Sequence, residues 1–248
     1  MSVKRGKKAI GRMALITCEN LSLGYEGREI LSGLHFSVNA GDYLCIVGEN
    51  GSGKSTLMRT ILGLQPPLRG DVNIGDGLRS TEIGYLPQQT VVQKDFPASV
   101  WEIVLSGCQG KCGARPFYRR EEKELAQRML HRLGLSDQKR RCYRELSGGQ
   151  QQRVLLARAL CATGKVILMD EPVSGLDPMV SAELYQRIRG LNQKDGVTVI
   201  MISHDIAAAV KDASHILHIG SPVFFGTKED YLASPLGQNY ISEGGVRP

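Results

Sequence analysis

The sequence predicts an α/β fold: a mostly parallel sheet flanked by helices, with an antiparallel β subdomain at its edge and an inserted α-helical subdomain. Three observations predict it. Short β-branched runs alternate with helical stretches, some apolar runs are continuous, and strand patterns vanish between about residues 97 and 145. A chain of 248 residues with 42% hydrophobic and 23% charged residues also buries enough surface to fold without disulfides or metal.

Two kinds of strand candidate occur along the chain. Alternating runs near glycines predict the antiparallel subdomain, and they are Leu15–Leu23, His35–Val38 and Val72–Ile74. Continuous apolar runs are typical of strands buried on both faces of a parallel sheet, and they are Tyr43–Val47, Lys165–Met169 and Val197–Ile202. We expect the second group to form the centre of the sheet.

The helical subdomain is predicted after the first strands. A set of apolar residues falls at helical spacing among Arg and Glu, namely Leu125, Met129, Leu130 and Leu133. We expect a helical subdomain over about residues 97–160, inserted into a single domain of residues 13–248. Residues 1–12 are basic and lack periodicity, and they predict a disordered tail dispensable for the activity.

The net charge of +6 is unevenly distributed. Residues 1–12 hold five basic residues and no acid, and residues 111–144 hold eleven basic residues and four acids. All other residues together carry a net charge of −6. Since non-specific nucleic-acid binding uses a broad basic face, no nucleic-acid partner is expected. No apolar run is long enough to span a membrane or to form a signal peptide, so a cytosolic chain with six reduced cysteines is expected.

The strongest motif is a glycine-rich loop between a predicted strand and a predicted helix over Thr56–Leu64. It reads Gly48-Glu49-Asn50-Gly51-Ser52-Gly53-Lys54-Ser55 and matches G-x-x-x-x-G-K-[ST]. Glycines let backbone N–H groups surround phosphate oxygens, and the helix N-terminus adds partial positive charge. Lys54 would reach the β- and γ-phosphates and Ser55 would ligate Mg²⁺, unless the segment is only a strand–helix turn.

A second motif ends the predicted strand that begins near Lys165. This strand delivers Asp170 and Glu171 at its carboxyl end, where ligands bind in open α/β sheets. Asp170 can orient a magnesium ion, and Glu171 can accept a proton from an attacking water. Acids at a strand end often only meet solvent, but together with the phosphate loop they indicate a P-loop NTPase.

A third motif, Leu146-Ser147-Gly148-Gly149-Gln150, precedes a helical stretch over Gln151–Cys161. Ser147 is a good N-cap, and the two glycines leave the amides of the helix N-terminus uncovered. The motif is either a second phosphate-binding device or an ordinary helix start that contains glycine.

Taken in order, the motifs carry a resemblance to a known family. They are Gly48–Thr56, Leu146–Gln150, Asp170-Glu171-Pro172, Ser174–Asp177 and Ser203-His204-Asp205. Over about residues 14–233 the chain resembles the nucleotide-binding subunit of an ATP-binding cassette (ABC) transporter. The resemblance implies a P-loop NTPase with an ABC-type core, ATP and Mg²⁺ as cofactors, and ATP hydrolysis coupled to transport.

The resemblance also implies roles for single residues. Gly48–Thr56 and Tyr25 would bind ATP, with Tyr25 stacked on the adenine. Glu171, His204 and Gln88 would be catalytic, and Ser55, Gln88 and Asp170 would surround Mg²⁺. Leu146–Gln150 would act on the ATP of a partner subunit, and Asp177 would contact that subunit.

The partners follow from the same resemblance. It implies a homodimer with ATP at the interface, integral membrane permease subunits, and indirectly an extracellular substrate-binding protein. The chain would lie on the cytoplasmic face of the membrane, where residues 111–144 either meet anionic headgroups or form a solvated helix face. The permease would bind the helical insertion, where Phe96, Pro97, Val100 and Trp101 are either contact residues or core residues.

The transported substrate is indicated more weakly. Tyr85–Gln89, His218–Gly220 and Phe224–Gly226 are most similar to importers of zinc and manganese. The alternatives are an importer of siderophores or haem, an exporter, or an ABC-type ATPase that acts on nucleic acid or ribosomes. The last class is expected to carry two cassettes or long coiled-coil insertions.

Two cysteines raise the question of a metal site. Cys108 and Cys112 are four residues apart and could share one face of a helix, with Cys142 as a third ligand. Structural zinc needs four ligands, and no fourth stands at a recognisable spacing. We therefore expect packed or solvent-facing thiols.

Overall fold

The computed structural model describes residues 14–25, 28–75, 77–79, 82–88, 95–204 and 210–242. The predicted tail over residues 1–12 lies outside this range. Among the described helices, none is long and apolar enough to cross a membrane.

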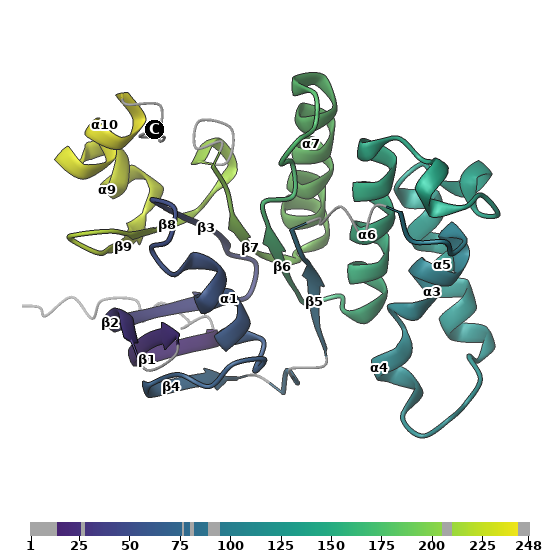
Figure 1. The fold of residues 1–248 in the computed structure, drawn as a ribbon, viewed down its shortest axis with the longest axis horizontal. Coiled ribbons are helices and arrows are strands. Elements are labelled where there is room, and N and C mark those ends of the chain that lie inside the picture. The colour runs from purple at the N-terminus through teal and green to yellow at the C-terminus, as the bar shows by residue number, and fades with distance from the viewer. Residues whose placement is uncertain are drawn as a thin grey trace, which may run out of the picture.

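A mostly parallel sheet forms the centre of the molecule (Figure 1). Its strands, as far as the chain is described, run in the order β5-β6-β7-β3-β8-β9, and only β9 is antiparallel to its neighbour. They are β3 (Tyr43–Gly48), β5 (Ile83–Leu86), β6 (Val166–Asp170), β7 (Thr198–Ile202), β8 (His215–Ile219) and β9 (Phe224–Thr227). Strands β3, β6 and β7 are buried along their whole length. This confirms the prediction that the three continuous apolar runs form strands buried on both faces.

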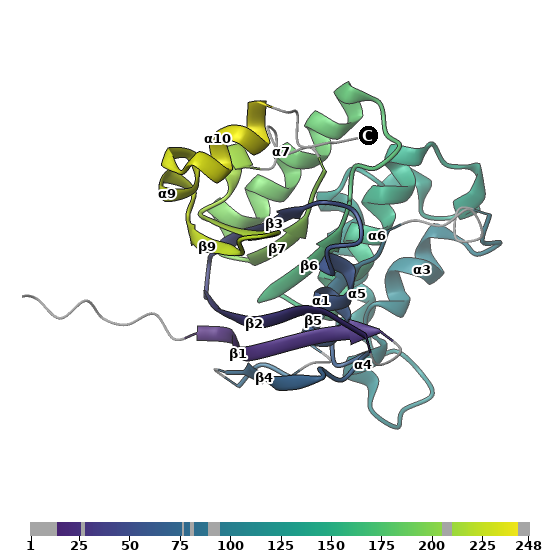
Figure 2. The ribbon, with the colours of Figure 1, turned by 60° about the vertical axis from the view of Figure 1, so that its left-hand side comes forward.

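The alternating runs form a second, antiparallel sheet. Within the described residues it has the order β2-β1-β4, with β1 (Ala14–Tyr25), β2 (Arg28–Asn39) and β4 (Arg69–Ile74). This sheet is separate from the central one, and helix α1 (Lys54–Ile61) lies between the two (Figure 2). The predicted antiparallel subdomain is therefore confirmed, as a sheet of its own.

Alternate residues of the central strands enter two different hydrophobic clusters. In β3, Tyr43, Cys45 and Val47 belong to one cluster, whereas Leu44 and Ile46 belong to the other. The first cluster contains the helices that follow β5, and the second contains α1 and the antiparallel sheet. The helices that follow β5 therefore cover one face of the central sheet, and α1 with the antiparallel sheet covers the other.

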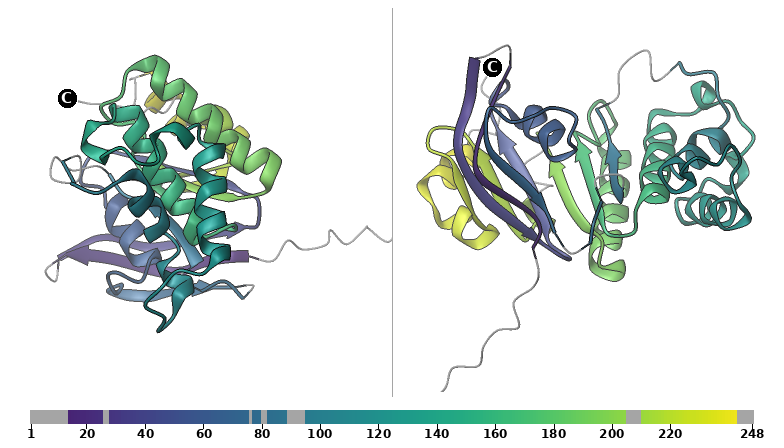
Figure 3. Two further views of the ribbon diagram at one scale, coloured as in Figure 1. Left: turned by 90° about the vertical axis from the view of Figure 1, so that its right-hand side faces the viewer. Right: turned by 90° about the horizontal axis from the view of Figure 1, so that it is seen from below.

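The described elements between β5 and β6 are all helical. They pack together on the outer side of β5, as the teal helices of Figure 3 show. Its elements are α3 (Val100–Ser106), α4 (Gln109–Cys112), α5 (Arg120–Arg132), η2 (Ser136–Gln138), η3 (Tyr143–Glu145) and α6 (Gly148–Ala162). In α5 and its C-cap, Leu130 and Leu133 are buried as their spacing predicts, and Leu125 and Met129 pack against the same cluster.

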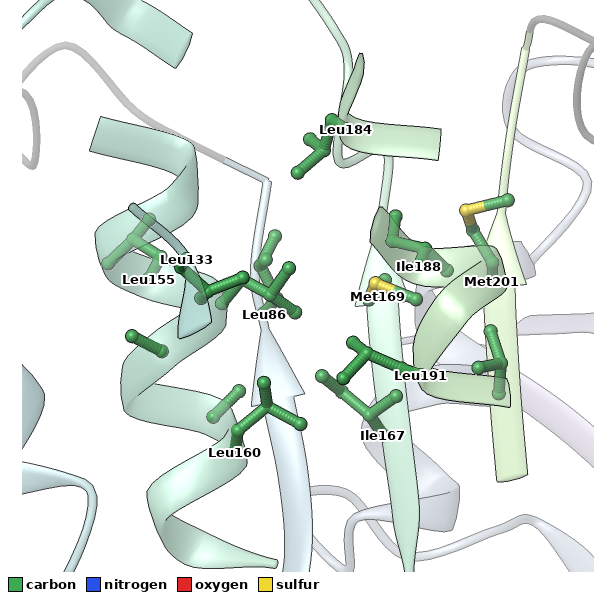
Figure 4. Packing of buried hydrophobic residues seen from close by; sticks show 14 of the residues in the cluster. Leu86, Leu133, Leu155, Leu160, Ile167, Met169, Leu184, Ile188, Leu191 and Met201 are labelled. Carbon is green, nitrogen blue, oxygen red and sulfur yellow. The ribbon is translucent and has the colours of Figure 1, made fainter. Parts of the chain in front are cut away.

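Helix α6 anchors this helical segment to the sheet. Figure 4 shows Leu155 and Leu160 of α6 on one side of Leu86, with Ile167 and Met169 of β6 on the other. Helix α7 (Pro178–Asp195) completes the cluster with Leu184, Ile188 and Leu191. The chain then closes with β8, β9, α9 (Lys228–Ala233) and α10 (Pro235–Ser242).

Candidate functional site

The glycine-rich loop connects the buried end of β3 to the first turn of α1. Gly48, Gly51 and Gly53 have φ angles of 144°, 80° and 100°, which residues with a Cβ rarely adopt. A Cβ at Gly48 would in addition overlap the backbone oxygen of Ile219. Because the first N–H groups of a helix have no acceptor within the helix, the loop and α1 together offer donors to an anion.

Lys54 lies inside this loop and is only 6% exposed. Its Nζ donates to the backbone oxygens of Gly48 at 2.8 Å and Glu49 at 2.7 Å. Burial lowers the pKa of the Lys54 ammonium, and the nearby carboxylates of Glu171 and Asp170 oppose that shift. The loop therefore contains a preoriented, partly desolvated cation.

Asp170 ends β6 beside the loop and is 5% exposed. Burial raises the pKa of its carboxyl group, although a hydrogen bond from the Ser55 side chain acts in the opposite direction. Within the described structure its Oδ1 has no hydrogen-bond partner, and neither has the buried Oγ of Ser52 in the loop. Buried polar atoms normally have partners, so these two oxygens are available to contact a bound ligand.

Glu171 follows directly and joins two residues that are distant in sequence. Its Oε2 accepts from Nε2 of Gln88 at 2.8 Å, and its Oε1 lies 2.6 Å from Nε2 of His204. Glu171 has φ 48°, a conformation that is uncommon for a residue with a side chain and is concentrated at functional sites. Gln88, Glu171 and His204 follow the carboxyl ends of β5, β6 and β7, so the order of these strands creates the cluster.

The residue types of the third motif, Leu146–Gln150, are explained partly by the start of α6 and partly by its packing on the start of α7. Ser147 caps α6 in a capping box with Gln150, as its residue type predicts. A Cβ at Gly149 would overlap Val180 at the start of α7, and one at Gly148 would crowd Leu176. These two glycines therefore permit close packing of α6 on the segment around Asp177, which is exposed at the N-cap of α7.

The structure does not bring the third motif to the phosphate loop of the same chain. Helix α6 packs in the cluster on one face of the central sheet, and α1 packs in the cluster on the other face. The side chain of Tyr25, together with Gln89 and Asp205, lies outside the described residues.

The two cysteines of the candidate metal site are packed in the helical segment. Cys108 and Cys112 are buried, with the Cys108 thiol donating to the Glu122 backbone oxygen at 3.7 Å and the Cys112 thiol to the Cys108 backbone oxygen at 3.5 Å. In the part of the chain that the structure describes, no group of three or more His, Cys, Asp or Glu side chains could hold a metal ion.

A groove of about 350 Å³ lies on the helical segment. It is lined by Phe96, Ala98, Glu102, Ile103, Ser106, Tyr143, Leu155 and Arg158. Phe96 is 54% exposed at this groove, whereas Val100 is fully buried in the core. The Lys139 ammonium lies 3.8 Å from the centroid of the Trp101 ring. Val100 is therefore a core residue and not a contact for a partner.

Sequence reasoning missed two features of the site. The hydroxyl of Ser203, the residue before His204, lies 3.0 Å from the Tyr185 hydroxyl, and the Tyr240 hydroxyl accepts a hydrogen bond from the Gly48 amide at 3.1 Å. Both join residues far apart in the chain, so no local pattern could have indicated them.

Comparisons with known proteins agree with this geometry. The profile of the family described as ABC transporter matches residues 31–174. The manganese transport system ATP-binding protein MntB of Bacillus subtilis is 36% identical over 91% of this chain and 92% of its own. The zinc uptake system ATP-binding protein ZurA of Listeria innocua is 31% identical over 92% and 90%. The ADP conformation of MJ1267, an ATP-binding cassette of an ABC transporter, superimposes with a TM-score of 0.77 at 28% identity, covering 92% of this chain and 99% of that one.

The loop glycines predict a graded effect of alanine substitution. Gly51→Ala introduces only the strain of a positive φ, about 1–3 kcal/mol, because no atom lies within 4 Å of its added Cβ. Gly48→Ala adds the overlap with Ile219 and should cost about 1–3 kcal/mol more. Urea unfolding of both variants measures the difference, and equal losses of unfolding free energy would contradict the tight approach at Gly48.

Asp170 predicts a pH-dependent stability. Because its folded-state pKa is raised, the folded protein binds this proton more tightly than the unfolded chain, and the ionised carboxylate destabilises the ligand-free protein at neutral pH. Asp170→Asn should therefore be more stable than the parent at neutral pH. The advantage should shrink as the pH falls through the raised pKa, which thermal unfolding across a pH series would show. A variant less stable than the parent at neutral pH would contradict the net cost of burying this carboxylate.

Proposed function

The chain belongs to the ABC transporter family and is an ATPase, and we propose that it powers a membrane importer of a divalent transition metal such as manganese or zinc. The observation that carries the proposal is the convergence of Gln88, Glu171 and His204 beside a loop that holds a buried Lys54. The substrate class rests on the two relatives, which are named for manganese transport and zinc uptake.

ATP binding follows from the loop. The amides between Glu49 and Ser55, apart from that of Ser52, which donates to the Glu49 backbone oxygen, would surround the β- and γ-phosphates together with the Lys54 ammonium. Ser52 Oγ supplies a further buried donor. We propose that Tyr25, at the end of β1, stacks on the adenine. This proposal rests on the resemblance to the family, in which an aromatic residue at this position has that role. Gly48, which the resemblance places among the ATP-binding residues, would contribute the turn into the loop and not an amide donor, because its N–H donates to the Tyr240 hydroxyl.

Oxygen atoms around the loop fit a bound magnesium ion. The unpartnered Oδ1 of Asp170, the Ser55 hydroxyl and the Gln88 side chain form the kind of oxygen donor set that Mg²⁺ prefers. When bound with ATP, the ion would neutralise charge on the phosphate oxygens.

Glu171 is the proposed general base. A water attacks the γ-phosphorus, a new P–O bond forms, the bond to the ADP oxygen breaks, and the water proton passes to the Glu171 carboxylate. Gln88 and His204 hold this carboxylate from both sides, which fixes its direction at the end of β6. His204 is also the proposed contact to the γ-phosphate.

A second copy would complete the site. The capped N-terminus of α6, with Ser147, Gly148 and Gly149, lies on the face of the sheet opposite α1 and cannot serve its own loop. We propose a head-to-tail homodimer in which Leu146–Gln150 of each chain covers the ATP of the other, and in which the exposed Asp177 contacts the partner.

The groove at Phe96 is the proposed site for the permease. It combines the exposed Phe96 ring with Glu102 and Arg158, and its lining residues belong to the helical segment. The helices α3 and α6 of this segment lie on the far side of β5 from α1 (Figure 1). Binding there would hold the chain on the cytoplasmic face of the membrane, with an extracellular substrate-binding protein as an indirect partner. The residues of the ATP site would not contact the transported substrate, so they do not distinguish a metal importer from an importer of siderophores or haem or from an exporter. The transport experiment below makes this distinction.

Glu171→Gln tests the proposed function directly. The amide keeps the size and hydrogen bonding of the side chain but loses its basicity, so turnover should fall by about 10²–10⁴-fold. ATP binding should survive, because the loop and Lys54 are unchanged, and the variant should accumulate as an ATP-bound dimer in analytical ultracentrifugation.

Lys54→Ala is the matched control, since it should bind ATP poorly and stay monomeric. In cells that supply the permease, Glu171→Gln should abolish uptake of manganese or zinc. Hydrolysis by Glu171→Gln at the parental rate would contradict the assigned base, and loss of export instead of uptake would contradict the direction.

If the groove at Phe96 binds the permease, a substitution there should abolish transport without affecting ATP hydrolysis by the isolated subunit. Phe96→Glu places a charge at the apolar groove and should abolish metal uptake and permease copurification, with the ATPase activity of the isolated subunit unchanged. Phe117→Glu is the control, because Phe117 is 81% exposed and does not line the groove. Uptake that survives Phe96→Glu would contradict this docking surface.

A further inference from the structure

The C-terminal helices contact the phosphate loop through a cluster of rings. His218 of β8 lies between Tyr231 of α9 and Tyr240 of α10. Its Nδ1 is 2.9 Å from the Tyr231 hydroxyl, and its ring centroid is 4.5 Å from that of Tyr240 at an interplanar angle of 60°. The Tyr240 hydroxyl in turn accepts the hydrogen bond from the Gly48 amide.

The backbone around this cluster is closely packed. Gly48 pairs with Ile219 in the parallel ladder of β3 and β8, directly after the pair of Val47 and His218. On the other side, a Cβ at Gly237 would overlap the Tyr231 backbone oxygen, so glycine lets α10 approach α9. Tyr240 itself packs against the main hydrophobic cluster. Its ring is therefore held against His218 and this cluster while its hydroxyl reaches the loop.

We propose that Tyr240 is a positioning residue of the ATP site, which sets the first peptide of the phosphate loop. The inference rests on the proposed nucleotide site and assigns to helix α10 a role in it. Gly48 is the point where the chain turns from β3 into the loop, at a φ that only glycine readily adopts. By accepting its N–H, Tyr240 holds this peptide away from the phosphates and fixes the direction in which the following amides point.

Removing only the hydroxyl separates this role from packing. Tyr240→Phe keeps the ring against His218 and leaves the partly buried Gly48 N–H without its acceptor. The loop then samples more conformations, and part of the binding free energy is spent on ordering it. We expect the Kd for Mg-ADP to rise about fivefold and the KM for ATP to rise with it, with kcat within about twofold of the parent.

The measurements are isothermal titration with Mg-ADP, steady-state hydrolysis, and hydrogen exchange of the nucleotide-free loop on the full chain. Tyr118→Phe is the matched control, since Tyr118 is a partly buried tyrosine of the helical segment outside this cluster. The amide hydrogens of the loop should exchange faster in Tyr240→Phe than in the parent. In Tyr118→Phe they should exchange at the parental rate.

Unchanged Mg-ADP affinity in Tyr240→Phe would overturn the inference, and so would a lower melting temperature with parental Kd, KM and loop exchange. A parental protein that itself binds no Mg-ADP would instead overturn the nucleotide site on which the inference depends.

Discussion

The parallel order of β5, β6, β7 and β3 is the constraint on which the site depends. Parallel strands end at the same edge of a sheet, so the segments that follow them must meet there. Gln88, Glu171 and His204 follow three of these strands, and the phosphate loop follows the fourth. The chemistry is therefore assembled by hydrogen bonding between strands and not by proximity in the chain.

Burial on both faces of this sheet has a second consequence. The central strands send alternate side chains into two clusters, and each cluster is covered by a layer of its own, the helices after β5 on one face and α1 with the antiparallel sheet on the other. Helices α1 and α6 are thereby placed on opposite faces, and the capped N-terminus of α6 does not reach the glycine-rich loop of its own chain. In the proposed function a second copy would supply this N-terminus, and the placement of the two helices is the physical argument for the proposed dimer.

Polar groups in the site are held at a cost to the stability of the ligand-free fold. Lys54 is buried with two backbone acceptors, Asp170 is buried with an unpartnered oxygen, and Glu171 has a positive φ. Such features destabilise a protein unless the surrounding packing supports them. Here the support comes from fully buried β3 and β6, whose ends position these residues.

The sequence alone determined the features that depend on short stretches of chain. Continuous apolar runs predicted the buried strands, the glycine pattern of residues 48–55 predicted the anion loop, and Ser147 predicted the start of α6. Local sterics and hydrophobic periodicity suffice for these. Only the tertiary structure decided that Gln88 lies within 2.8 Å of Glu171, that Val100 is a core residue, that Gly149 is required by Val180, and that Tyr240 holds Gly48. Each of these depends on strand order or on the packing of distant elements, which no local pattern encodes.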